Sequence, residues 1–293
     1  IQTFNINFLV IPFNKPYLSG NELQYIGEAV QSGKISGNGV FTKKSQQFFE
    51  EKYGFRRCLL TTSCTDALEM AAILCDIQVG DEVIVPSYTF VSTANAFVLR
   101  GAKIVFADSS AENPNLDADK LLGLITPKTK AIICVHLAGW PCEMTAINEL
   151  AKLHGLIVIE DCAQAHGASY KGVSVGSLAD AAAWSFCQDK IMTTGGEGGM
   201  LTTNNLELWY KAWSYKDHGK DWDAVYNRQH PAGFRWLHES FGTNWRMLEM
   251  QGVIGRIQLT RMADWHQARK QNAIKILVAC AESNALRVPQ VPD

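Results

Sequence analysis

The sequence lacks the features that would place it in a membrane or on a nucleic acid. No run of about 20 uninterrupted apolar residues is present, so we expect no membrane-spanning helix and no membrane partner. The formal net charge is only −2, which gives no reason to expect a nucleic acid or an anionic membrane as partner. With 47% hydrophobic and 19% charged residues among 293, the composition is that of a globular protein with a large core.

Several ligand-binding patterns are also missing. The glycines form neither a GxGxxG fingerprint nor a GxxxxGK[ST] loop, which argues against a Rossmann dinucleotide site and a P-loop. Five histidines show no metal-ligand spacing such as HExxH, so we predict no metal site. These are His136, His166, His218, His230 and His238. The eight cysteines include no CxxC pair, and several lie in apolar runs, which predicts reduced thiols in a cytoplasmic protein.

Apolar, β-branched runs alternate with helical patterns along most of the chain. This alternation predicts an α/β fold with a mostly parallel sheet flanked by helices. The predicted strands are 58–61, 82–85, 103–106, 131–135, 156–160, 181–186 and 199–203. The predicted helices are 65–75, 91–99, 118–125, 144–154, 206–214, 246–259 and 262–283. The stretch 216–242 has no clear period, and a loop of that length is usually functional or flexible.

Lys190 lies between two informative segments. An apolar run precedes it, and the glycine cluster 195–199 follows it and allows tight turns and a close backbone approach. Further upstream, a mostly apolar strand ends at Asp161, and a buried acid needs a partner. Pyridoxal phosphate (PLP) requires these two residue types, since a lysine forms its Schiff base and an aspartate holds its pyridine nitrogen protonated. The competing interpretations are a solvent-exposed lysine and an aspartate that forms a salt bridge or a helix cap.

Other polar groups follow strand ends, where ligands of α/β sheets bind. The segment 61–66 leaves a strand and enters a helix, so its hydroxyls and free N–H groups suit a phosphate. An ordinary N-cap explains the same residues. Tyr88 can stack on a flat cofactor ring or pack in the core. Gln164 lies within reach of the phenolic oxygen of such a ring, and Ser185 can offer a second hydroxyl to the phosphate.

In the order and spacing of these motifs, the chain resembles the DegT/DnrJ/StrS family of PLP-dependent sugar-nucleotide aminotransferases. The resemblance covers residues 11–273. Its motifs are Ile11–Phe13, Gly37–Gly39, Thr62–Leu68, Pro86–Phe90, Glu160–Gly167, Ser185–Phe186 with Lys190, Gly195–Gly199, and Gly242–Met247 with Gln251 and Ile254–Gly255. The region 86–108 and Glu143-Met144 are similar to enzymes that aminate dTDP-4-oxo-6-deoxyglucose.

The resemblance implies PLP fold type I, as in aspartate aminotransferase, and a homodimer with its sites at the interface. It implies that Lys190 and Asp161 are the catalytic residues, with Lys190 bound to PLP and Asp161 paired with the pyridine nitrogen. The other residues implied to bind the cofactor are Gln164 at the phenolic oxygen, Thr65, Asp66 through its backbone and Ser185 at the phosphate, Tyr88 on the ring, and Asn244 at the phosphate of the partner subunit's cofactor.

The resemblance also implies the reaction. L-glutamate is the expected amino donor and a keto-deoxysugar nucleotide, dTDP-4-oxo-6-deoxyhexose, the expected acceptor, in amino-sugar synthesis for a surface polysaccharide or glycoconjugate. Lys190 moves the proton, and the kinetics are ping-pong. The loop 216–242 is our candidate for binding the nucleotide diphosphate. The side chains expected to do so are Arg228, His230, Arg235 and Trp236.

The implied organisation has a large PLP-binding domain over residues 11–255. Residues 256–293 are expected to begin a small C-terminal domain that is truncated here, and residues 1–10 stay unassigned because they show no signal-peptide pattern. Two other functions compete with the aminotransferase. One is a PLP-dependent deoxysugar dehydratase, although relatives of that type carry a histidine at the position of Lys190. The other is a truncated, non-catalytic protein that dimerises or binds sugar nucleotides.

Overall fold

The computed structural model describes residues 12–289, so the expectation for residues 1–10 lies outside it. A sheet of seven strands forms its centre, in the order β1-β9-β8-β5-β4-β2-β3. The strands are β1 (Arg57–Thr61), β2 (Glu82–Pro86), β3 (Lys103–Ala107), β4 (Thr129–Val135), β5 (Ile157–Asp161), β8 (Ala181–Ser185) and β9 (Gly199–Thr203). β9 pairs antiparallel with both β8 and β1, and the other pairings are parallel. The predicted strands and the mostly parallel sheet are confirmed.

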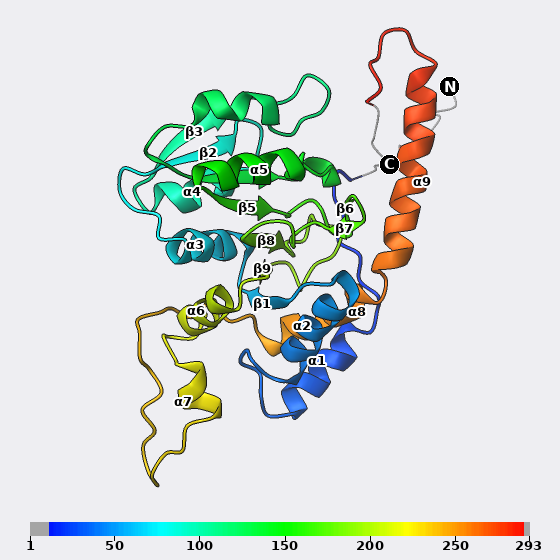
Figure 1. Ribbon diagram of the computed structural model, residues 1–293. Helices are drawn as coiled ribbons and strands as arrows, with labels where there is room; N and C mark the ends of the chain where they lie inside the picture. The colour runs from blue at the N-terminus through cyan, green and yellow to red at the C-terminus, as the bar shows by residue number, and fades with distance from the viewer. Residues whose placement is uncertain (1–11, 290–293) are drawn as a thin grey trace, which may run out of the picture.

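Helices cover both faces of this sheet (Figure 1). Alternate strand residues reach opposite faces, so Val83 and Val85 pack on one side and Ile84 on the other. The first face lies against α3 (Cys64–Leu74), α4 (Ser92–Val98) and α6 (Leu206–Lys216). The second face lies against α5 (Met144–His154), the 3-10 helix η1 (Ala118–Leu124) and α2 (Val40–Tyr53). A short hairpin of β6 (Ser169–Tyr170) and β7 (Val173–Ser174) follows β5.

Three helices near the ends of the chain differ from the predicted pattern. α1 (Glu22–Gln31) and α2 were not predicted, and both pack against α8 (Glu249–Leu259). α8 begins three residues later than expected because Leu248 is extended. It also runs unbroken through residue 255, where the expected domain boundary lies. The change from packed to exposed helix comes at α9 (Met262–Ala281), in which only Met262 is buried.

Residues 217–244, here called the arm, leave the body of the protein beyond α6 (Figure 1). The expected irregular loop contains a short helix, α7 (Trp222–Tyr226). At its base, the arm is closed by a bridge between Asp217 and Asn244. Trp213 on α6 packs against Trp222 with 4.9 Å between ring centroids. Within residues 12–289, no helix is both long and apolar enough to cross a membrane.

Gly199 provides a test of the sheet's close contact with α3. A Cβ atom added there would lie 2.2 Å from the Ser63 carbonyl carbon and 2.5 Å from the Cys64 nitrogen. Because both neighbours are backbone atoms, we expect Gly199→Ala to lower the free energy of unfolding by more than about 3 kcal/mol. Gly27→Ala on α1 is the control, because a Cβ atom added there meets nothing within 4 Å. This substitution should raise the free energy of unfolding by up to about 1 kcal/mol. Urea denaturation measures both, and equal effects would contradict the close contact.

Candidate active site

Asp161 and Ser185 end two adjacent parallel strands, β5 and β8. Ile159 and Ala183, two residues earlier on each strand, belong to the core shared with α3 and α4. Because side chains alternate along a strand, Asp161 and Ser185 point to that same face. The site therefore lies at the carboxyl ends of the strands, where open α/β sheets bind ligands.

The Asp161 carboxylate is 5% exposed and is held by two donors. Thr93 Oγ1 donates to Oδ2 at 2.7 Å, and the Ala163 N–H donates to Oδ1 at 3.1 Å. Burial raises the pKa of Asp161, and the two hydrogen bonds offset that rise only in part. The remaining desolvation penalty would fall if a cation, such as a protonated ring nitrogen, lay against the carboxylate.

The N-terminus of α3 offers backbone donors beside these strand ends. Ser63 caps the helix, and its Oγ accepts from the Asp66 N–H at 3.0 Å. The N–H groups of Cys64 and Thr65 have no hydrogen-bond partner among residues 12–289, and a helix N-terminus with free N–H groups favours an anion. Thr65 Oγ1 lies 3.0 Å from Ser92 Oγ on α4. The Asp66 N–H is thus engaged by the cap, and the free donors are those of Cys64 and Thr65.

Lys190 lies in the turn after β8, and its side chain is 20% exposed. Its Nζ atom donates to Asp189 Oδ2 at 3.1 Å. The charge of Lys190 acts to lower the pKa values of both Asp161 and Cys64, which places the ammonium group within electrostatic reach of the strand end and of α3. Burial nevertheless raises the pKa of the Cys64 thiol well above its usual range, so Cys64 stays a thiol.

Two further predicted residues lie around this cluster. Gln164 is exposed, and its Oε1 accepts from the Ala138 N–H at 2.8 Å, which fixes the side chain beside the loop after β4. Tyr88 follows β2 and is 62% exposed, so it does not pack in the core. An exposed ring at a strand end is available for stacking on a flat ligand.

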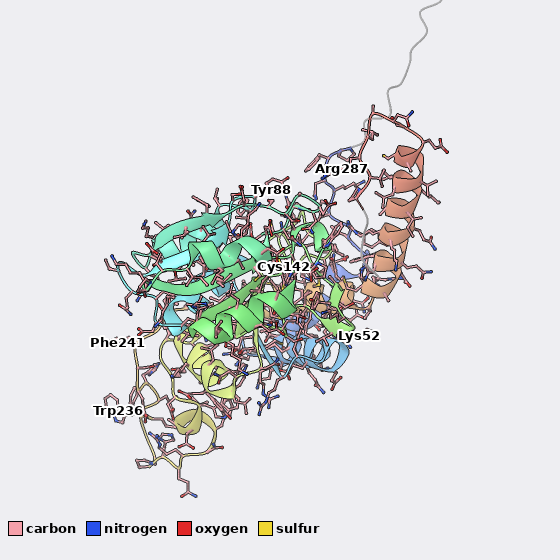
Figure 2. The ribbon with its side chains drawn as sticks, turned by 45° about the horizontal axis from the view of Figure 1, so that its top comes forward. Lys52, Tyr88, Cys142, Trp236, Phe241 and Arg287 are labelled. Carbon is pink, nitrogen blue, oxygen red and sulfur yellow. The ribbon has the colours of Figure 1, made fainter. Side chains whose placement is uncertain are left out.

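The remaining predicted residues lie on the arm. No hydrogen bond within residues 12–289 joins Asn244 to the cluster around Asp161; its Oδ1 accepts from Arg246 Nε at 2.9 Å. Arg228 forms ion pairs with Asp221, Asp223 and Glu239. His230 Nε2 lies 2.6 Å from the Ala224 carbonyl oxygen. Arg235 and Trp236 are exposed, and Figure 2 shows Trp236 and Phe241 at the far end of the molecule from Arg287. Of the arm cations, Arg228 is already neutralised by carboxylates.

Two residues of the site were missed by the sequence reasoning. Thr93 orients Asp161 from α4, and His166 donates from Nε2 to the Ser185 carbonyl at 2.7 Å. Thr93 lies in a context that resembles any helix start, and His166 lies in the motif Glu160–Gly167, but no local signal predicts the contact that either residue makes. His166 is fully buried, and burial lowers its pKa to about 4, which leaves a neutral ring that donates one hydrogen bond.

The residues present fit PLP. A buried carboxylate with a raised pKa suits a protonated pyridine nitrogen, and free N–H groups at a helix N-terminus suit a phosphate. Gly199 brings the β8–β9 end against α3, and Ser185, its register partner on β8, points to the same face of the sheet. Lys190 supplies the amine. The ring nitrogen and the phosphate would therefore have matching groups at the carboxyl ends of β5 and β8, with Lys190 in the turn that follows β8.

Comparison with known proteins points to the same cofactor. The sequence model of the DegT/DnrJ/EryC1/StrS aminotransferase family matches residues 16–290. The GDP-perosamine synthase of Caulobacter vibrioides is 41% identical over 259 residues, which span 88% of this chain and 67% of that protein. Other relatives are named for UDP-linked and dTDP-linked sugars.

Solved structures share the fold. An aminotransferase from Psychrobacter cryohalolentis matches with a TM-score of 0.92 and 49% identity, over 95% of this chain and 72% of that one. A Streptococcus pneumoniae protein solved in its PMP form matches with a TM-score of 0.81 and 28% identity, over 89% of this chain and 70% of that one. The fold expected from the sequence is confirmed.

The buried ring of His166 predicts a pH dependence of stability. Its pKa is about 4 in the folded protein against an ordinary 6.5, so the unfolded chain binds more protons between these values. Lowering the pH through that window should therefore cost about 3 kcal/mol of unfolding free energy. His166→Gln keeps a donor for Ser185 but does not titrate, so its loss of stability should be smaller by that amount. Urea denaturation at pH 7 and pH 4 checks this, with the exposed His154→Gln as control; identical pH profiles of His166→Gln and wild type would contradict it.

Proposed function

Because this chain belongs to the DegT/DnrJ/EryC1/StrS aminotransferase family, we propose that it transfers an amino group to a nucleotide-linked keto-deoxysugar with PLP as cofactor. The observation that carries this function is the placement of Asp161, Lys190 and the free N–H groups of α3 at the carboxyl ends of the strands. Lys190 speaks against the dehydratase alternative. The non-catalytic alternative is not favoured by any feature of the site.

PLP supplies an electron sink for the charge that develops on the donor Cα atom. The residues of the protein would bind the cofactor and move the protons. Asp161 keeps a proton on the pyridine nitrogen, and Thr93 and Ala163 hold its carboxylate in place. Lys190 Nζ would hold the cofactor and would move a proton to and from the substrate carbon. The N-terminus of α3 and the Ser185 hydroxyl bind the phosphate.

The substrates are the finer part of the proposal. We take L-glutamate as the donor and dTDP-4-oxo-6-deoxyhexose as the acceptor, since the region 86–108 is similar to enzymes that aminate such a sugar. A GDP-linked keto-deoxysugar is the second candidate, favoured by the 41% identity to a GDP-perosamine synthase. Relatives named for a spore coat polysaccharide and for perosamine support a role in making surface polysaccharide.

We also propose a homodimer in which the arm of one subunit reaches the site of the other. The arm carries Phe234, Trp236 and Phe241 at 75%, 80% and 98% exposure, and clustered exposed apolar side chains mark interaction surfaces. In this arrangement, Arg235 and Trp236 are available to contact the acceptor. Arg228 and His230 instead stabilise the arm, through their contacts with Glu239 and the Ala224 carbonyl respectively.

The base of the arm has an excess of positive charge that suits a phosphate. Asp217 is buried and is shared by Lys220 at 3.1 Å and Arg246 at 3.4 Å. Lys216 lies beside it, fully buried, and burial lowers its pKa to about 8. Asn244 is exposed at this point. Three cations around one carboxylate leave positive charge beside Asn244. This charge supports the proposal that Asn244 contacts the phosphate of the partner subunit's cofactor.

The first half-reaction is testable by absorbance. The purified protein with PLP should show a visible band that L-glutamate bleaches, and Lys190→Ala should lack the band because no amine then holds the cofactor aldehyde. Lys171→Ala, a lysine on the hairpin turn, is the matched control and should behave as wild type. A folded wild-type protein without a Lys190-dependent band would refute the aminotransferase and favour a non-catalytic role. With the band established, dTDP-, GDP- and UDP-linked keto-sugars are compared as acceptors.

Shared sites predict complementation between subunits. Lys190→Ala and Asn244→Ala homodimers should each be nearly inactive, since one lacks the amine and the other a phosphate ligand. If Asn244 acts across the interface, subunits mixed by refolding should form hybrids with one intact site and regain about a quarter of wild-type activity, from random pairing. Mixtures with Arg235→Ala test the acceptor contact in the same way. No recovery in verified hybrid dimers would place these residues in the site of their own subunit.

A further inference from the structure

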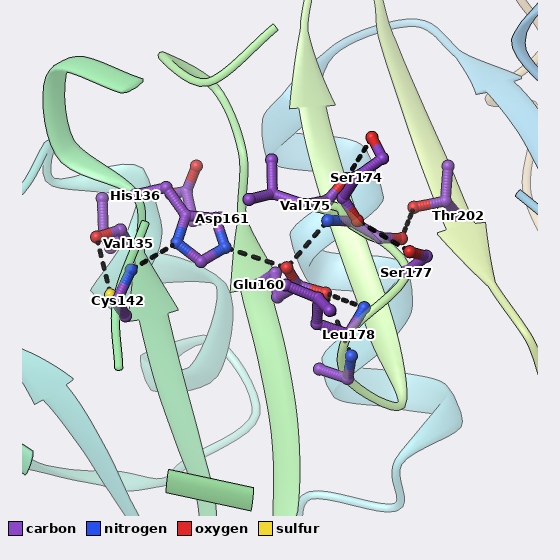
Figure 3. Close-up of polar contacts among 12 residues, drawn as sticks. Val135, His136, Cys142, Glu160, Asp161, Ser174, Val175, Ser177, Leu178 and Thr202 are labelled. Carbon is purple, nitrogen blue, oxygen red and sulfur yellow. Dashed lines mark hydrogen bonds and ion pairs between the residues drawn. The ribbon is translucent and has the colours of Figure 1, made fainter. Parts of the chain in front are cut away.

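Glu160 precedes Asp161 on β5 and therefore points to the opposite face of the sheet. Its carboxylate is fully buried and accepts four hydrogen bonds (Figure 3). Oε2 accepts from His136 Nε2 at 2.8 Å and from the Gly176 N–H at 2.7 Å. Oε1 accepts from the N–H groups of Leu178 and Ala179 at 2.9 and 3.0 Å. All four contacts are donors, so the side chain serves purely as an acceptor.

The donors around His136 decide where its ring proton lies. Nδ1 lies 3.0 Å from the Cys142 nitrogen, whose N–H can only donate, so Nδ1 must be the acceptor. The proton is therefore on Nε2, directed at Glu160. Both ring nitrogens and both carboxylate oxygens are satisfied, which is the condition under which a buried polar group rigidifies its surroundings.

This pair is tied directly to two cofactor residues on the other face. The His136 N–H donates to the Asp161 carbonyl at 3.2 Å, so His136 is joined to β5 through both its backbone and its ring. Two residues later, the Ala138 N–H holds Gln164 Oε1. Ala138 has a φ of +53°, a conformation that a residue with a side chain keeps only when the surroundings impose it.

We propose that the His136–Glu160 pair is a positioning element that aligns Asp161 and Gln164 with the pyridine ring of the cofactor. The inference rests on the proposed function, since it names residues that act through Asp161. The pair fixes the ends of β4 and β5 and the segment 176–179 relative to one another. Small displacements of a group that must face one ring nitrogen are costly to the reaction.

A metal site is the other use that these residues suggest. Ligand atoms of His136, Glu160 and Cys162 lie within 4.8 Å of one another. An ion would have to displace the proton on His136 Nε2 and the backbone donors of Glu160. It would also need a thiolate at Cys162, whose pKa burial raises well above its usual range. The hydrogen bonds therefore favour the positioning role.

Glu160→Gln tests the proposal because an amide cannot replace the carboxylate. Whichever way the amide lies, its NH₂ group faces two of the four donors and leaves them unpaired. We expect the pH midpoint of the visible band of bound PLP to shift and kcat for the L-glutamate half-reaction to fall by about 10- to 100-fold. The KM for the sugar nucleotide should stay near that of wild type, because no acceptor contact is changed.

His136 variants separate hydrogen bonding from packing. His136→Gln offers both an acceptor to Cys142 and a donor to Glu160, whereas His136→Leu offers neither. We expect the glutamine variant to retain more of the wild-type band and kcat than the leucine variant. Glu82→Gln is the matched control: it is a buried carboxylate at the amino end of β2, so it should lower stability and leave the band and kcat unchanged.

The outcomes are distinct. Folded Glu160→Gln and His136→Leu proteins with the wild-type pH midpoint and kcat would overturn the positioning role. If wild type itself shows no glutamate-sensitive band, the proposed function fails instead. If the variants do not fold, ¹⁵N spectra of the wild-type histidine rings decide. A protonated Nε2 on His136 whose shift changes when PLP is added supports the proposal, and a protonated Nδ1 or an unchanged shift refutes it.

Discussion

The alternation of side chains along a strand places two adjacent carboxylates, Glu160 and Asp161, on opposite faces of the sheet. On one face, Glu160 collects donors from the loops that follow β4 and β7. On the other face, Asp161 accepts a hydrogen bond from Thr93 at the proposed position of the cofactor ring. Since the two carboxylates share one stretch of backbone, whatever fixes Glu160 also fixes Asp161. The rest of the site is assembled around that strand end.

The two carboxylates differ in how fully they are satisfied. Glu160 has a donor for each of its hydrogen-bonding directions inside the protein, whereas burial leaves Asp161 with a raised pKa that its two donors do not offset. A buried charge without an opposite charge is unfavourable, so a cation bound beside Asp161 would stabilise its carboxylate. The face where the cofactor ring is expected thus keeps a buried carboxylate with a raised pKa, whereas the carboxylate on the other face accepts four hydrogen bonds.

Two neutral, buried histidines lie in the segments that follow β4 and β5. His136 and His166 each donate one hydrogen bond, to Glu160 and to the Ser185 carbonyl respectively. A neutral imidazole gives a rigid donor without adding a charge that would compete with Lys190 or the ring nitrogen. The reaction class follows from family membership, whereas the proposed choice of sugar nucleotide would depend on side chains of the arm and on a second subunit.

The seven central strands, and the position of Asp161 at the end of one of them, could be predicted from the sequence, because apolar runs and strand-end motifs are local patterns. α2 could not, because its start depends on Glu249, a distant carboxylate that accepts from the N–H groups of Gly39 and Phe41. Thr93 and the His136–Glu160 pair were invisible for the same reason. The sequence by itself determined which chemical groups are present and which strands carry them. Only the tertiary structure decided which groups meet, because hydrogen-bond partners far apart in the chain leave no periodic mark on either segment.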